Sequence, residues 1–240
     1  MCGRYTLIAS QGAIQGAFDI KLDRFDWMRH FPRYNIAPSQ RVLVVVNSPD
    51  QTLVNAEPSQ TISRGARVAD LFSWGLIPFW AKDPAIGNRM INARAETLAE
   101  KPAFRTSLRK KRCLVVADGF YEWRADAGKR VPMRITLKSA EPFAFAGLWD
   151  EWKAPTGEPV RSCTIITTTP NEVMADIHNR MPVILGSEAE KVWLDPDVQD
   201  ASLLASLLAP YPTDRMSAYR VSPLVNSPKN DSPECILPVW

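Results

Sequence analysis

The stretch RCLVVADGFYEWRADAGKRVPMRITL, residues 112–137, indicates the fold class more directly than other parts of the chain. It begins with a continuous apolar run at 112–118, and the dipeptide Ala127-Gly128 lies between two further extended segments, as the turn of a β-hairpin does. Continuous apolar runs are typical of strands that are covered on both faces or curled into a barrel. The stretch therefore predicts a curved sheet that contains at least one hairpin, with a strand at 131–137.

Similar short apolar runs and a few helical patterns alternate irregularly along the rest of the chain. The other predicted strands are 41–46, 142–148 and 162–168. The predicted helices are 92–104, 171–178, 187–194 and 197–208. Asn171 and Ser187 are the predicted N-caps of two of these helices. Because strands and helices mix without a βαβα rhythm, and no linker divides the chain, we expect an α+β fold. It would be a single domain with a curved or barrel-like, mostly antiparallel β-sheet and peripheral helices.

The composition is that of a globular protein and excludes several functional classes. Hydrophobic residues make up 45% of the 240 residues and charged residues 23%, so disorder is not indicated. A net charge of +3 is too small to identify a nucleic-acid-binding protein by total charge. No apolar run approaches the roughly 18 residues of a membrane span, and the N-terminus lacks signal-peptide features. We therefore expect a cytoplasmic protein, nucleoid-associated if bacterial, that has no membrane partner.

Cysteine and histidine usage argues against a metal site and against a disulfide framework. The chain holds two histidines, His30 and His178, and its cysteines form no CxxC pair. The four cysteines are Cys2, Cys113, Cys163 and Cys235. Cys113 and Cys163 lie in apolar runs, which predicts inert core thiols. No metal and no cofactor are expected.

Cys2 stands in a position with distinctive chemistry. Removal of Met1 would give one residue a free amine, with a pKa of about 7.7 to 8.0, and a thiol, with a pKa of about 8.5. An aldehyde would condense with the amine to an imine, and the thiol would close onto the imine carbon as a thiazolidine ring. The second step is intramolecular, and such steps can reach effective molarities of about 10⁵ to 10⁸ M. The alternative is a small buried side chain without a reaction.

Two further side chains are candidates for proton transfer. Glu122 lies in the aromatic run Phe120-Tyr121-Glu122-Trp123, and apolar surroundings raise the pKa of a carboxyl group, which suits a general acid. An edge-strand glutamate that faces water is the competing interpretation. His178 ends a helical pattern, where a histidine also serves as a simple partner of the helix dipole.

Six short motifs occur in a fixed order: MCGRY, RYNIAP, WGLIP, INARAET, DGFYEW and DIHNRMP. Together they resemble the SOS response-associated peptidase (SRAP) family, and the resemblance runs from Cys2 to about Pro223. It implies one domain over 1–240, with a core at about 2–223 and a C-terminal extension at 224–240. The combination of a second-position cysteine with the later motifs makes the resemblance specific, although each motif alone is weak.

The resemblance implies a sensor of abasic sites in single-stranded DNA. It would form a covalent thiazolidine DNA-protein crosslink through Cys2 after removal of Met1 and so protect the lesion, a lyase-like activity. Glu122 would move the protons of sugar opening and imine formation, His178 would assist, and Asn92 would position the amine of Cys2. These four residues must then meet in one pocket. The expected partner is single-stranded DNA that contains abasic sites, and the protein is expected to be a monomer.

DNA contacts also follow from the resemblance. It implies phosphate ligands at Arg4, Arg94 and Arg180, beside Asn35, and base contacts at Pro38, Trp80 and Trp123. Some family members have a second aromatic residue where Ala81 follows Trp80, so Phe79 is an alternative wedge between bases. The basic run at 105–113 is either a further DNA contact or a solvated helix face.

Two other functions stay open at this point. Cys2 could be the nucleophile of a thiol peptidase or of an autoprocessing enzyme, with His178 or Glu122 as its base. The protein could also be a non-covalent single-stranded DNA-binding module in which Cys2 is only packed. A covalent band on abasic DNA distinguishes both from the crosslinking hypothesis.

Overall fold

The computed structural model describes residues 2–22, 26–47 and 66–239. Strands β10, β4, β3, β6 and β9 pair in this order, and β9 pairs again with β10, which closes a five-stranded barrel. The pair β4 and β10 is parallel, and the other pairs in the ring are antiparallel. The barrel strands are β3 (Arg41–Asn47), β4 (Arg67–Trp74), β6 (Arg112–Ala117), β9 (Phe143–Lys153) and β10 (Pro159–Thr168).

Three short strands extend the barrel at its edges. β5 runs parallel to β10, β11 pairs with β10, and β12 pairs with β9. Their bounds are β5 (Asn92–Arg94), β11 (Met181–Pro182) and β12 (Ile184–Leu185). The attachment of β5 to β10 brings Asn92 opposite Ile165 in the barrel wall.

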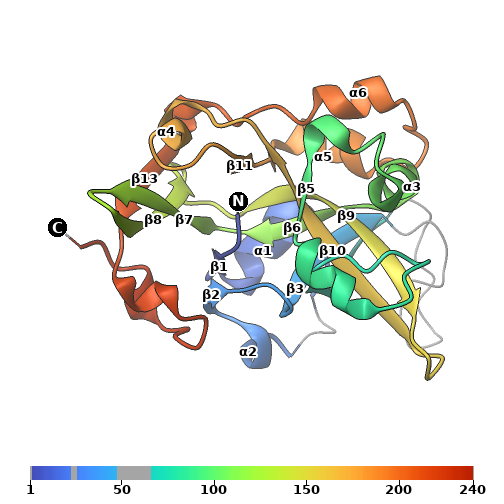
Figure 1. Ribbon diagram of the computed structural model, residues 1–240, viewed down its shortest axis with the longest axis horizontal. Coiled ribbons are helices and arrows are strands. Elements are labelled where there is room, and N and C mark those ends of the chain that lie inside the picture. The colour runs from blue at the N-terminus through green and yellow to red at the C-terminus, as the bar shows by residue number, and fades with distance from the viewer. Residues whose placement is uncertain (1, 23–25, 48–65, 240) are drawn as a thin grey trace.

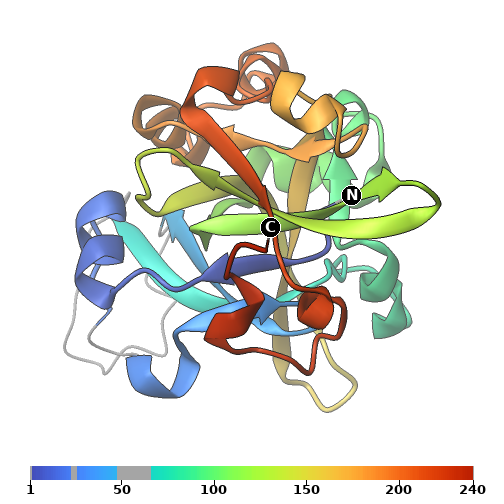
Figure 2. The same ribbon diagram turned by 90° about the vertical axis from the view of Figure 1, so that its left-hand side faces the viewer.

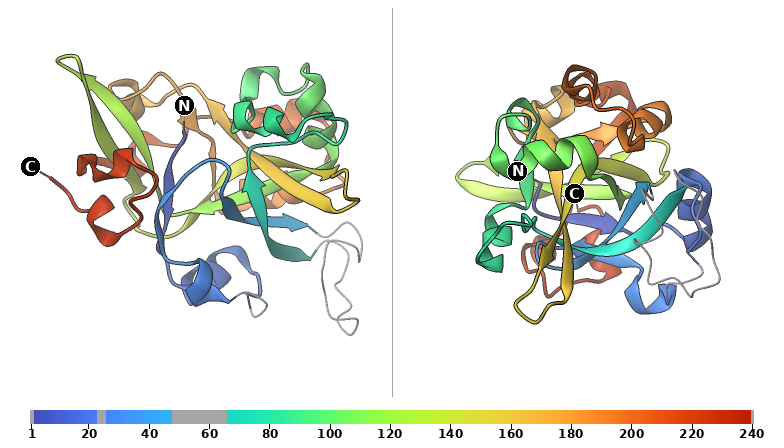
Figure 3. Two further views of the ribbon diagram at one scale, coloured as in Figure 1. Left: turned by 60° about the horizontal axis from the view of Figure 1, so that its bottom comes forward. Right: turned by 90° about the vertical axis from the view of Figure 1, so that its right-hand side faces the viewer.

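A second, antiparallel sheet packs beside the barrel, with strand order β13-β8-β7-β1-β2. Its strands are β1 (Tyr5–Leu7), β2 (Arg33–Ile36), β7 (Gly119–Asp126), β8 (Lys129–Leu137) and β13 (Met216–Arg220). β6 and β7 are nearly continuous in the chain, so one extended segment passes from the barrel into the second sheet. Figure 1 shows the barrel on the right and the second sheet on the left, and the β7–β8 hairpin projects from the body in Figure 3.

Helices and short 3₁₀ turns cover the outside of the two sheets (Figure 1). The α-helices are α1 (Gln11–Phe18), α2 (Trp27–His30), α3 (Pro102–Lys110), α4 (Glu172–Ala175), α5 (Ser187–Leu194) and α6 (Ala201–Ser206). The 3₁₀ turns are η2 (Pro84–Arg89), η3 (Ala95–Thr97), η4 (Thr213–Arg215), η5 (Pro223–Asn226) and η6 (Pro233–Cys235). The expected α+β single domain with a curved, barrel-like and mostly antiparallel sheet is confirmed.

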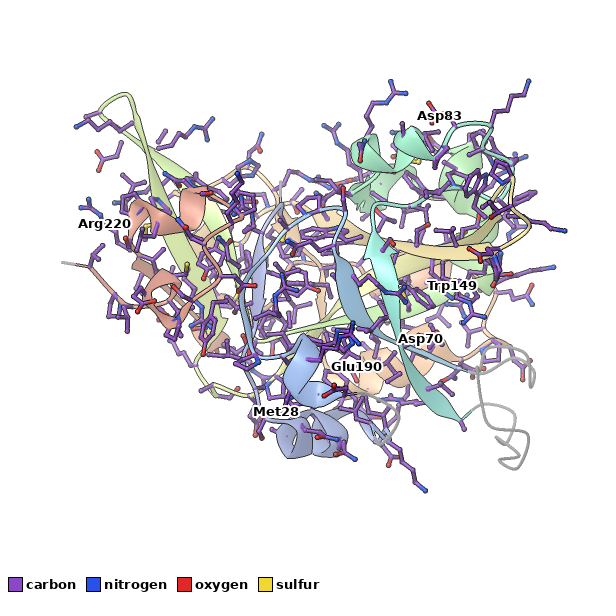
Figure 4. All side chains as sticks on the ribbon, turned by 90° about the horizontal axis from the view of Figure 1, so that it is seen from below. Met28, Asp70, Asp83, Trp149, Glu190 and Arg220 are labelled. Atoms are coloured by element: carbon purple, nitrogen blue, oxygen red, sulfur yellow. The ribbon has the colours of Figure 1, made fainter. Side chains whose placement is uncertain are left out.

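Strand β3 of the barrel is covered on both of its faces. Val42 to Val46 are all buried, and such side chains fit a pleated surface that is covered on both sides. Gly147 of β9 allows the close approach of strands: a Cβ atom there would lie 2.9 Å from the sulfur of Cys113 and 3.0 Å from the carbonyl oxygen of Thr164. Figure 4 shows side chains packed among the strands, and the exposed side chains of Met28 and Arg220 lie at the outside of the molecule.

The strands predicted from apolar runs are confirmed, but the predicted helix at 92–104 is wrong. Asn92–Arg94 form the strand β5, η3 follows, and helix α3 begins only at Pro102. The helical spacing of this segment was overridden by the backbone pairing of β5 with β10. A proline at the first helical position then fixes the start of α3.

The other predicted helices differ in length and in their caps. α4 and α6 are shorter than expected, at Glu172–Ala175 and Ala201–Ser206. Asn171 caps α4 through its side chain, as predicted. Ser187 is the first residue of α5 rather than its N-cap, which is Gly186. No helix in the described ranges is both long and apolar enough to cross a membrane.

Candidate functional site

Cys2 lies at the start of the chain segment that enters the second sheet, and it is completely buried. β1 and β7 are antiparallel, with Tyr5 opposite Phe120, and the amide of Tyr121 donates to the carbonyl oxygen of Arg4 at 2.9 Å. If this pairing is extended from Tyr5 toward the N-terminus, Cys2 lies beside the part of β7 that contains Glu122. The same sheet therefore positions the thiol and the carboxyl group.

Glu122 is buried on β7, with 3% of its surface exposed. Burial raises the pKa of this carboxyl group, and the nearby His178 opposes the rise. Burial also raises the pKa of the Cys2 thiol far above its usual range, and the charge of Glu122 adds to the rise. The carboxyl group thus lies within electrostatic reach of both Cys2 and His178.

Asn92 reaches the same site from the barrel side. Its Nδ2 donates to the carbonyl oxygen of Cys2 at 2.8 Å, across 90 residues of sequence. Its Oδ1 is buried and has no hydrogen-bond partner among the described residues. Asn92 therefore fixes the backbone of Cys2 and keeps one acceptor for another donor.

His178 follows α4 and is half-buried. Its backbone amide donates to the carbonyl oxygen of Met174 at 2.7 Å, and its ring Nδ1 lies 3.0 Å from the amide nitrogen of Arg180, which donates to it. A ring nitrogen that accepts a hydrogen bond carries no proton, so the neutral ring is protonated at Nε2. Cys2, Asn92, Glu122 and His178, predicted from the sequence as one site, are brought together by the fold.

Arg4 and Asn35 lie inside a network that holds the C-terminal segment. Arg4 donates to Oδ1 of Asn35 at 2.8 Å and to the carbonyl oxygen of Val225 at 2.8 Å, and its guanidinium lies 5.7 Å from the ring centre of Trp123. Nε1 of Trp123 donates to Oδ1 of Asn226 at 2.7 Å. Figure 2 shows this C-terminal segment beside the N-terminal strands.

Asn35 itself is completely buried. Its Nδ2 donates to the carbonyl oxygens of Val225, Ser227 and Asn230 at 3.2, 3.0 and 2.7 Å. A phosphate needs a hydrogen-bond donor, and Nδ2 is the only donor group of this side chain. Because Nδ2 already binds these carbonyl oxygens, it is not free for a phosphate. The structure thus gives Asn35 a structural role, and a direct contact with DNA would require these bonds to break.

The other predicted DNA contacts differ in exposure. Arg94 is exposed and forms no ion pair within the described part of the chain. Arg180 is bound at both terminal nitrogens by Glu96, with distances of 2.5 and 2.9 Å, and only 15% of its side chain is exposed. Arg94 is consequently better placed for a phosphate than Arg180.

Two aromatic side chains stand out on the surface between β4 and η2. Phe79 is 58% exposed and Trp80 is 48% exposed, whereas Ala81 is buried. The loop is fixed by bonds from the Phe79 amide to Asp150 and from Trp152 to the carbonyl oxygen of Ala81. Both aromatic rings are exposed, so either ring is accessible for stacking.

The half-buried Pro38 lies in a turn that contacts the same region. Ser39 donates through its amide to the carbonyl oxygen of Trp74 at 2.8 Å, and its hydroxyl lies 3.4 Å from Oδ1 of Asn88. Leu76 bonds to Met90, two residues before Asn92. This turn and the aromatic loop therefore adjoin the chain segment that leads into the site.

Glu96 and Thr167 both bind Arg180 and were not predicted from the sequence. The only signal for Glu96 is its place two residues after Arg94 in the INARAET motif. Thr167 lies in an apolar strand and gives no signal of its own. The described residues contain no cluster of three or more His, Cys, Asp or Glu that could hold a metal ion.

The fold and the site define a class of protein: a closed five-stranded barrel with an added antiparallel sheet, in which a buried carboxyl group lies within electrostatic reach of a second-position cysteine and of a histidine. The family described as SOS response associated peptidase (SRAP) matches residues 1–228, and the chain belongs to this family. The resemblance in the sequence is thereby confirmed.

Named relatives and solved structures agree with this assignment. The chain is 52% identical over 238 residues to "Abasic site processing protein YoqW" of Bacillus subtilis, covering 98% of this chain and 99% of that protein. It is 32% identical to "Abasic site processing protein HMCES" of Rattus norvegicus, covering 88% of this chain and 66% of that protein. A crystal structure of a protein from Bacteroides thetaiotaomicron has a TM-score of 0.83 at 29% identity, and each chain is fully covered.

Proposed function

We propose that the protein processes abasic sites in single-stranded DNA and that it does so by forming a thiazolidine crosslink through Cys2 once Met1 is removed. The names of the relatives support abasic-site processing. The chemistry is supported chiefly by one observation, the buried carboxyl group of Glu122 beside the thiol of Cys2. The crosslink would protect the lesion in a cytoplasmic protein that acts as a monomer.

The proposed reaction uses the raised pKa of Glu122. A protonated carboxyl group donates to the ring oxygen as the ring carbon–oxygen bond breaks, and the resulting carboxylate takes up the proton that the anomeric hydroxyl group loses as it becomes the aldehyde. The amine of Cys2 then adds to the aldehyde carbon, and loss of one water molecule gives an imine. The thiol adds to the imine carbon, so a carbon–sulfur bond forms and the thiol proton ends on the ring nitrogen. No step of this sequence calls for a metal or a cofactor.

The same observation disfavours a thiol peptidase. A cysteine nucleophile that cleaves peptides is activated by a lowered pKa, usually beside a cationic group. Here burial and the adjacent carboxyl group raise the pKa of the Cys2 thiol. A thiol that stays protonated until a neighbouring base removes its proton suits ring closure onto an imine, because the amine attacks first.

A gel assay with abasic single-stranded DNA tests the proposal. The wild-type protein should give a shifted band that survives denaturation, and Cys2→Ala should give such a band only after borohydride reduction, because its amine can form an imine but no ring. Cys235→Ala removes another buried thiol and should crosslink as the wild type does. The intact mass of each protein must be measured to establish that Met1 is absent. A stable, unreduced band with Cys2→Ala would overturn the thiazolidine mechanism.

We further propose that Arg94 binds a DNA phosphate, since it is exposed and has no ion pair within the described residues. Arg94→Ala should weaken binding of all single-stranded sequences and reduce the slope of log affinity against log salt by about 0.7. Fluorescence anisotropy at four salt concentrations measures this slope. Arg29→Ala, which removes an exposed arginine of α2, is the matched control. Equal slopes for Arg94→Ala and the wild type would exclude the contact.

A further inference from the structure

An ion pair joins the two chain segments that carry Asn92 and His178. Oε1 and Oε2 of Glu96, in η3, accept hydrogen bonds from Nη1 and Nη2 of Arg180 at 2.5 and 2.9 Å. Nη2 of Arg180 also donates to the carbonyl oxygen of Thr167 in β10, at 2.6 Å. Such a two-pronged pair fixes direction as well as distance. Arg180 is therefore anchored to two elements at once.

The backbone of Arg180 in turn holds the ring of His178. The Arg180 amide nitrogen lies 3.0 Å from Nδ1, and the Arg180 carbonyl oxygen lies 3.3 Å from the same nitrogen. An unprotonated Nδ1 accepts from the amide, and a protonated Nδ1 donates to the carbonyl group. The backbone of one residue thus offers a partner to the ring in either charge state, which leaves Nε2 directed elsewhere.

We propose that Glu96 is a positioning residue for the crosslinking reaction: by fixing the side chain of Arg180 it holds the Arg180 backbone against His178. The proposal rests on the proposed function, because it assigns Glu96 to the same site. The alternative role is that Arg180 binds a DNA phosphate and that Glu96 occupies the position of this phosphate only in the free protein.

Two observations favour positioning over competition with phosphate. The Arg180 side chain is 15% exposed, whereas that of Glu96 is 47% exposed, so the carboxylate covers the guanidinium from the solvent side. The guanidinium also donates a hydrogen bond to the carbonyl oxygen of Thr167 in β10. The hydrogen bonds from Arg180 lower the pKa of Glu96 and so favour its charged carboxylate form.

Kinetics of the full-length protein separate the two roles. Glu96→Ala should lower the crosslinking rate at saturating abasic oligonucleotide by about 10- to 100-fold, because misplacement of a catalytic group by about 1 Å can cost that much. The oligonucleotide concentration at half-saturation should stay within about twofold of the wild type. Glu96→Gln keeps one acceptor oxygen and should recover part of the rate. The control is Glu188→Ala, which breaks the exposed Glu188–Lys191 pair of 2.7 Å and should leave both parameters unchanged.

Nitrogen-15 NMR of the imidazole rings gives a readout that does not depend on crosslinking. The chain contains only two histidines, so a His30→Gln variant assigns the signals of His178. In the neutral ring of His178, the wild type should show an unprotonated Nδ1 and a protonated Nε2, and Glu96→Ala should show averaging of the two tautomers. Glu188→Ala should match the wild type.

The outcomes are separable. An unchanged saturating rate and an unchanged tautomer in Glu96→Ala would overturn the positioning role. Tighter DNA binding with an unchanged saturating rate would overturn it as well, and would identify Glu96 as a competitor of phosphate at Arg180. If the wild type forms no crosslink, the proposed function fails, while the tautomer comparison still decides whether Glu96 positions His178.

Discussion

Glu122 sits on β7 with almost none of its surface exposed, and burial raises the pKa of its carboxyl group. A carboxyl group whose pKa is higher in the folded than in the unfolded state favours folding only while it is protonated. Its contribution is fully present below the unfolded value of about 4.3 and is lost as the pH rises through the folded pKa. The group that serves the proposed chemistry therefore reduces the stability of the fold at neutral pH.

Glu122→Gln should separate the cost of Glu122 to stability from its role in the proposed reaction. The free energy of unfolding should be higher than that of the wild type at pH 7, and the difference should vanish near pH 4, where both side chains are neutral. Crosslinking should slow by about 10²- to 10⁴-fold, since a general acid contributes that much. Urea unfolding at pH 7 and at pH 4 measures the difference in stability, and a crosslinking time course measures the rate. A variant that is less stable at pH 7 but crosslinks at the normal rate would contradict this account.

The C-terminal segment is bound to β2 through two side chains, Asn35 of β2 and Asp231 of the segment itself. Asp231 accepts hydrogen bonds from the amides of Tyr34 and Asn35 at 2.5 and 3.0 Å and pairs with Arg33. Asn35 holds three carbonyl oxygens of the same segment. Residues 224–235 are thus tied to the second sheet through side-chain and backbone hydrogen bonds.

Asn35→Ala should release this segment. Loss of the three hydrogen bonds from Nδ2, together with the acceptor of Arg4, should lower the free energy of unfolding by about 2–4 kcal/mol. Amide hydrogen exchange should speed up in 224–235 and not in β9 or β10. The salt dependence of DNA binding should stay at the wild-type value, because Nδ2 of Asn35 is already hydrogen-bonded within the protein. A flattened salt slope with normal exchange would instead support the DNA contact expected from the sequence.

Elements differ in how well the sequence predicts them, for physical reasons. β3, β6, β9 and β10 were predicted because burial on both faces leaves a continuous apolar run. β5 was missed because its three residues become a strand only by pairing with β10, more than 70 positions later. The motifs identified Cys2 and Glu122, but the bond between Glu96 and Arg180 joins residues 84 positions apart, and neither side chain carries a local sign of it.

For the whole molecule, Arg112 of β6 connects the barrel to two of its covering helices. Its Nη1 donates to the carbonyl oxygens of Leu108 and Arg109 at 2.8 and 2.9 Å, at the end of α3. Its Nε and Nη2 donate to the carbonyl oxygens of Trp193 and Asp195, at the end of α5. Carbonyl groups at helix C-termini lack partners within the helix, and a cation there also interacts favourably with the helix dipole.

Arg112→Met should therefore destabilise the whole fold rather than one helix. Methionine fills much of the buried space but removes the four hydrogen bonds that the guanidinium donates, which should cost about 3 kcal/mol of unfolding free energy. Urea denaturation followed by tryptophan fluorescence measures the cost. Arg109→Met is the matched control, since Arg109 is exposed at the end of the same helix and should change stability by no more than about 0.5 kcal/mol. Because Arg112 binds the helix ends and none of the four candidate catalytic residues, the folded Arg112→Met protein should crosslink at the wild-type rate at low temperature. Equal stabilities of the two variants would show that the helix ends do not depend on this guanidinium.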